Sequence, residues 1–121
     1  MDSSRDGSAI NRPPFFDGNN YAHWKRRMRA FLKSLDERVW MCVEDGWIWP
    51  QTDEGQPKPR GQWTELEYTQ CNHNSRGLNA IFNAVSSLES NRIMNCETSK
   101  EAWDILQVTH EGTSTVRRAK L

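Results

Sequence analysis

The sequence has few cysteines, no long apolar run and no signal segment, and each of these absences excludes a class of protein. Its three cysteines, Cys42, Cys71 and Cys96, are odd in number and widely spaced, so neither a disulfide framework nor a four-ligand metal site is expected. No stretch is apolar over the length needed to cross a bilayer, and the polar N-terminus does not resemble a secretory signal. We therefore expect a soluble, intracellular protein with reduced thiols and no membrane partner.

Net charge is also absent, because 16 Lys and Arg residues balance 16 Asp and Glu residues. Proteins dedicated to nucleic acids usually carry a basic excess that neutralises phosphates, so any RNA contact must be local and weak. A chain of 121 residues suits a single small domain. Six tryptophans supply much of its buriable surface, which predicts a core of few but aromatic residues.

The first half of the chain predicts a leader, two helices and a loop. Residues 1–14 are polar, end in two prolines and are expected to be a flexible leader before a single helical domain over residues 15–121. Asn20 is placed to cap a first helix, and Phe16 to pack on its first turn as a hydrophobic staple. The apolar stripe of this helix consists of Tyr21, Trp24, Met28, Phe31, Leu32 and Leu35.

Asp36 is placed to cap a shorter second helix that ends at Gly46. Its expected inward residues are Val39, Trp40 and Val43. Residues 47–61 then contain three of the five prolines and two glycines, so they predict a long loop. A loop of this length indicates either a functional segment or local disorder.

Three capping boxes punctuate the second half and predict three helix starts: Thr64 with Glu67, Ser86 with Glu89, and Thr98 with Glu101. The first of these helices is expected to be the longest and to be weakened at Gly77. Its expected inward residues are Leu66, Cys71, Leu78, Ile81, Phe82 and Val85. The second is expected to be short and to carry Leu88 and Ile93, and the third to present Ala102, Trp103 and Leu106 on one face.

The third helix should end near Gly112, and residues 113–115 look like a further helix start that the chain leaves incomplete. Alternation of period two is absent, so a sheet is not expected. The predicted fold class is all-α: a compact bundle of about five helices with one long loop containing proline and glycine.

The residue pattern contains no recognisable catalytic, metal or cofactor motif. Cys71 and His73 are two residues apart and would point about 200° away from each other on a helix, so we expect buried cysteines and surface histidines. No glycine-rich elbow or phosphate loop surrounds a nucleophile. We expect that the protein is not an enzyme and holds no cofactor or metal.

Two groups of residues are candidates for recognition. Lys25, Arg26, Arg27 and Arg29 form the one dense basic cluster, which predicts either a solvated helix face or a contact with RNA or a partner. Trp47 and Trp49 flank the loop, which predicts either a partner surface or local packing onto the second helix. The tryptophans at positions 24, 40, 63 and 103 are expected in the core.

Three stretches resemble the Gag proteins of copia-type long terminal repeat retrotransposons, particularly those of plants. Residues 16–24, FDGNNYAHW, are similar to the motif F-x-G-x-N-Y-x-x-W, and Trp40, Val43 and Gly46 follow. Residues 96–106, CETSKEAWDIL, resemble C-x-T-A-K-E-x-W-x-x-L. The resemblance covers nearly the whole chain, with Ser99 where alanine is common and His110 where tyrosine is common.

This resemblance implies a retroviral-capsid-like helical domain that packs against copies of itself. The copies would build cytoplasmic virus-like particles enclosing the RNA of the transposable element. The resemblance marks as signature core residues Phe16, Tyr21, Trp24, Met28, Leu32, Trp40, Val43, Trp103 and Leu106. Two alternatives stay open. One is a domesticated Gag-derived adaptor that binds a host protein, and the other is an RNA-binding or chaperone module.

Overall fold

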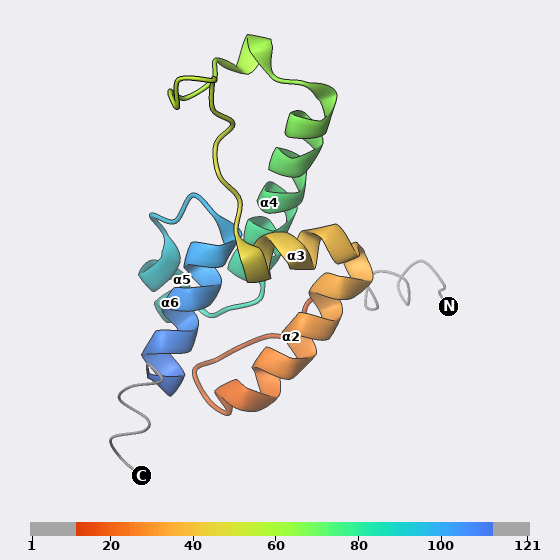
Figure 1. Cartoon of the computed structure of the whole chain (residues 1–121). Helices are drawn as coiled ribbons and strands as arrows, with labels where there is room; N and C mark the ends of the chain where they lie inside the picture. Colours follow the sequence, from red (N-terminus) through yellow and green to blue (C-terminus); the bar gives the residue numbers. More distant parts are fainter. Residues whose placement is uncertain (1–11, 113–121) are drawn as a thin grey trace.

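The computed structural model describes residues 12–112, and this part of the chain forms five α-helices and no strand (Figure 1). The elements in chain order are α2 (Tyr21–Leu35), α3 (Glu37–Asp45), the 3₁₀ helix η1 (Arg60–Gln62), α4 (Glu65–Asn83), α5 (Ser87–Ile93) and α6 (Ser99–Glu111). The expected all-helical bundle is therefore confirmed. No described helix has both the length and the apolar character needed to cross a membrane.

The N-terminal segment is fastened to the bundle through Phe16. Its ring is buried and lies 5.6 Å from the ring of Tyr21 and 5.0 Å from that of Trp24, so the predicted staple is present. The Phe16 backbone N–H also donates to the carbonyl of Ala84 at 2.7 Å. The indole N–H of Trp24 donates to the carbonyl of Pro14 at 2.9 Å, while residues 1–11 of the expected leader lie outside the described residues.

Helix α2 begins where the sequence predicts, but Asn20 acts through its backbone. Asn20 has φ 56°, and its side chain makes no capping hydrogen bond. Its carbonyl accepts from the N–H of Trp24 at 3.2 Å. Asparagine tolerates this left-handed conformation better than most residues, so the predicted side-chain cap is wrong although the helix boundary is right.

Most of the other predicted helix ends are correct. Asp36 caps α3 by accepting from the Arg38 N–H at 2.8 Å, and Gly46, with φ 97°, ends the helix. The boxes of Thr64 and Thr98 are both complete. Ser86 accepts from the Glu89 N–H, but the Glu89 side chain does not return to the cap. Its carboxylate instead lies against His110 and Arg92.

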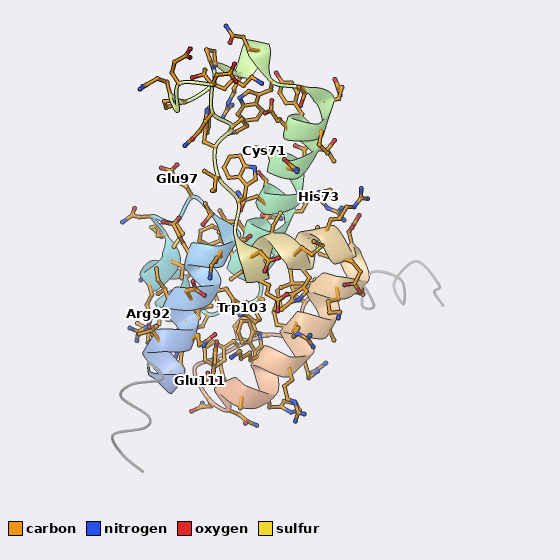
Figure 2. The ribbon with its side chains drawn as sticks, viewed as in Figure 1. Cys71, His73, Arg92, Glu97, Trp103 and Glu111 are labelled. Carbon is orange, nitrogen blue, oxygen red and sulfur yellow. The ribbon has the colours of Figure 1, made fainter. Side chains whose placement is uncertain are left out.

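The core lies among all five helices, and its aromatic residues come from Phe16, α2, α3 and α6. All nine expected signature residues are buried in it. The Trp103 ring lies 5.9 Å from that of Trp24 and 5.4 Å from that of Trp40, and Figure 2 shows Trp103 pointing from α6 toward the centre of the bundle. Trp63 is also buried, but outside this core, against the rings of Trp49 and Tyr68.

The predicted inward face of α4 is wrong in its first half. Leu66 is 65% exposed, because the first turns of α4 extend past the bundle and meet no core there (Figure 1). Cys71, Leu78 and Phe82 are half-buried. In the middle of the helix the buried residues are small or polar: His73, Asn74, Gly77 and Ala80.

Gly77 is a contact point between helices and not the weak point that its low helix propensity predicts. It faces Val43 of α3 and Ser99 of α6. Beside it, the Asn74 side-chain oxygen accepts from the backbone N–H of Ser99 at 2.8 Å. On α5, Leu88 is 65% exposed while Ile93 is fully buried.

Candidate interaction site

Residues 47–72 form an arm that projects from the bundle (Figure 1). The arm consists of the loop, η1 and the first turns of α4. The Lys58 carbonyl accepts hydrogen bonds from the indole N–H groups of Trp49 at 2.9 Å and Trp63 at 3.0 Å. The Arg60 guanidinium lies 5.1 Å from the Trp49 ring and 5.7 Å from the Trp63 ring, so the arm has an aromatic cluster of its own.

Further contacts fold the loop back onto α4. Lys58 pairs with Glu67 at 3.0 Å, and the Tyr68 hydroxyl donates to the Arg60 carbonyl at 2.6 Å. An isolated antiparallel bridge joins Gln51 to Pro57. The proline-containing segment is therefore a short ordered hairpin, and Trp49 packs locally within the arm.

A groove of about 340 Å³ lies at the root of the arm, between α3 and α4. Its lining residues are Arg38, Met41, Cys42, Asp45, Gly46, Trp47, Ile48, Leu66, Thr69, Gln70 and His73. Three of these are large apolar side chains with much of their surface in solvent: Met41 is 52% exposed, Ile48 76% and Leu66 65%. Apolar side chains gathered at a groove mark a surface suited to another protein.

The titratable groups of this groove do not form a nucleophilic pair. Burial, and then the charge of Asp45, raise the pKa of the Cys42 thiol, so it stays protonated and unreactive at neutral pH. Hydrogen bonds from Arg38 hold the pKa of Asp36, at the groove's edge, well below its usual range. His73 Nε2 lies 3.9 Å from Asp36 Oδ2, and Figure 2 places His73 on the side of α4 that faces α3. Within residues 12–112, His, Cys, Asp and Glu side chains nowhere gather in threes suited to a metal ion.

The predicted contrast of buried cysteines and surface histidines is wrong except at His23, which is exposed. All three cysteines are half-buried, while His73 is 7% exposed. The side chain of His110 is 16% exposed, and its Nε2 lies 2.8 Å from the buried Glu89 carboxylate. His73 and His110 both lie at contacts between helices, which their isolated positions in the sequence do not reveal.

The basic cluster is divided between two environments. Lys25 pairs with Glu111 at 3.3 Å, and the Arg29 guanidinium lies 5.3 Å from the Trp40 ring. Both line a groove that also contains the acidic residues Glu44 and Asp104. Arg26 and Arg27 are exposed and make no ion pair with another described residue. The cluster as a whole therefore does not form one anion-binding surface.

The structure adds Met41, Ile48 and Leu66 to the candidate residues and places Trp47 beside them. Of these three residues, only Met41 could have been recognised from the sequence as a surface candidate, because it is an apolar residue on the face of α3 opposite the one predicted to be buried. Nothing in the sequence indicated that Ile48 or Leu66 would lie at a shared surface, since each was compatible with local packing.

Comparison of the chain with protein-family models, with curated proteins and with solved structures found no match.

Proposed function

We propose that this chain is a structural Gag-like protein of a copia-type retrotransposon, which associates with copies of itself into a particle that encloses element RNA. The observation that carries the proposal is the set of exposed apolar side chains Met41, Ile48 and Leu66 around one groove. A bundle with its own aromatic core does not need these residues for folding, and their exposure favours a protein partner. The resemblance of residues 16–24 and 96–106 to copia-type Gag supplies the identity of that partner, a second copy.

Velocity sedimentation and electron microscopy of the full chain at rising concentration test this proposal. We expect fast-sedimenting assemblies whose fraction increases with concentration. Leu66→Ser should reduce this fraction without lowering the melting temperature appreciably, because Leu66 lies outside the core. Leu88→Ser is the matched control, since Leu88 on α5 is equally exposed at 65% but lies away from the groove. Equal effects of the two variants would remove the groove from the proposal.

In RNA packaging, Arg26 and Arg27 would contact the phosphates of the RNA. Their exposure on α2 leaves them available for phosphate, whereas Lys25 and Arg29 contact Glu111 and Trp40. Changing both Arg26 and Arg27 to Gln should weaken RNA binding and reduce the salt slope by roughly 0.7 for each lost phosphate contact. Changing Lys25 and Arg29 to Gln should have the smaller effect. Filter binding over a salt series that shows equal slopes for wild type and the Arg26/Arg27 variant would contradict this assignment.

A further inference from the structure

The residues of α3 that line the groove form one face of the helix along most of its length. Arg38, Met41, Cys42 and Asp45 all line the groove, and their spacing of three, four and seven residues places them on one side of the helix. The opposite face, formed by Val39, Trp40 and Val43, is buried in the core. α3 therefore presents a second stripe with a cation near its N-terminus, an anion near its C-terminus and Met41 in between.

This order of charges is self-complementary. In a two-fold symmetric contact, residue i of one copy meets residue j of the other and the reverse also holds. If two α3 helices cross antiparallel with the axis between residues 41 and 42, Arg38 of each copy meets Asp45 of the other. The same axis brings Met41 of each copy to Cys42 of the other.

We propose that a second copy of this chain occupies the groove by antiparallel pairing of α3 with α3, held by two Arg38–Asp45 ion pairs around a central Met41. The inference rests on the self-association proposed above and names its surface and symmetry. Ile48 and Leu66, which line the same groove, widen the apolar contact on both sides of the helix pair.

Both Arg38 and Asp45 can form an additional ion pair. Arg38 donates from Nε at 3.0 Å and from Nη2 at 2.9 Å to the Asp36 carboxylate. A guanidinium has five N–H donors, so donors remain for a carboxylate of another copy. Asp45 is exposed and forms no ion pair with any other residue in the described range. The His73 ring, the other titratable group on the α4 wall of the groove, lies toward Asp36, at the Arg38 end.

Charge reversal on the full chain tests the pairing. Arg38→Glu places two acidic residues in each contact and Asp45→Arg places two basic ones, so each variant alone should lose at least about tenfold in self-association. An equimolar mixture of the two variants should associate again, because every Arg then meets an acid in the other variant. The double variant Arg38→Glu/Asp45→Arg should also associate by itself.

Glu44→Arg is the matched control, because it reverses a charge on α3 next to Asp45 but outside this groove. Circular dichroism melts establish that each variant is folded, and Asp45→Arg remains informative if Arg38→Glu is destabilised through its contact with Asp36. Wild-type assembly that neither reversal weakens, or single variants that the mixture does not rescue, would overturn the α3 pairing and leave the proposed function standing. A wild-type chain that stays monomeric would overturn both.

Discussion

Gly77 of α4 lies against Ser99 of α6 so closely that a Cβ added at residue 77 would stand 3.2 Å from the Ser99 Cβ. The same Cβ would stand 3.1 Å from Val43 Cγ2. Val43 and Ser99 are both fully buried, so neither has room to move aside. This contact sets how closely α3, α4 and α6 approach one another.

Gly77→Ala is expected to destabilise the fold by about 1 kcal/mol, because overpacking outweighs the gain in helix propensity. The measurement is urea unfolding followed by circular dichroism. Gly61→Ala is the control, since a Cβ at residue 61 has no neighbour within 4 Å, and it should be neutral or slightly stabilising. A Gly77→Ala protein more stable than wild type would show that the three helices are not in close contact there.

The hydroxyl of Tyr21 is buried and has no hydrogen-bond partner among the described residues. Burial, with the charges of Glu111 and Asp104, raises its pKa above the usual range. Tyr21→Phe removes this group, so the free energy of unfolding should stay the same or rise by up to about 1 kcal/mol. Tyr68→Phe should instead cost about 0.5 to 1 kcal/mol, because it removes the 2.6 Å bond to the Arg60 carbonyl. Destabilisation by Tyr21→Phe would mean that the hydroxyl has a partner.

His110 joins α6 to α5 and to the aromatic core. Its Nε2 lies 2.8 Å from the Glu89 carboxylate, and its ring lies 5.3 Å from that of Tyr21 and 4.8 Å from that of Phe16. His110→Ala is expected to cost about 3 kcal/mol, since it leaves the buried Glu89 carboxylate with Arg92 as its remaining described partner.

His110→Tyr should retain an aromatic ring for the contacts with Tyr21 and Phe16 and a donor for Glu89. Its cost is expected to stay below about 1.5 kcal/mol. Thermal melts of the alanine and tyrosine variants show whether an aromatic ring with a donor is sufficient at this position. Equal losses for alanine and tyrosine would show that the site requires the imidazole itself.

The capping box of α6 should make stability depend on pH. Hydrogen bonds from the backbone of Glu97 and Thr98 lower the pKa of Glu101 from its ordinary value of 4.5. A carboxyl whose pKa is lower in the folded state stabilises the fold fully above the unfolded-state pKa, and this contribution disappears as pH falls through the folded-state pKa. Stability should therefore decline from about pH 5 downward.

Glu101→Gln removes the titrating group from this box. Its melting temperature should lie below that of wild type at neutral pH and approach it near about pH 3. Glu54→Gln removes the same charge in the exposed turn of the arm, outside any helix cap, and serves as the charge-matched control. A constant difference between Glu101→Gln and wild type over this range would contradict the assignment.

Local signals in the sequence predict most of the fold. The spacing from Tyr21 to Leu32, the Asp36 cap and the boxes at Thr64 and Thr98 all depend on residues within a turn or two of one another. Each correctly marks a helix or a helix end.

The errors arise where distant segments decide the outcome. The burial of Leu66 depended on whether the bundle core would extend along the whole of α4, and the core does not reach its first turns. The site was missed for the same reason: Met41 and Leu66 are 25 residues apart in the sequence and line one groove only because α4 packs beside α3. No periodicity within one helix carries that information.

Self-association of this chain can be measured by sedimentation equilibrium over a wide concentration range. We expect an average mass that rises with concentration above the 14.1 kDa of one chain, and Asp45→Arg should suppress this rise. A mass that stays at 14.1 kDa at every concentration would contradict it.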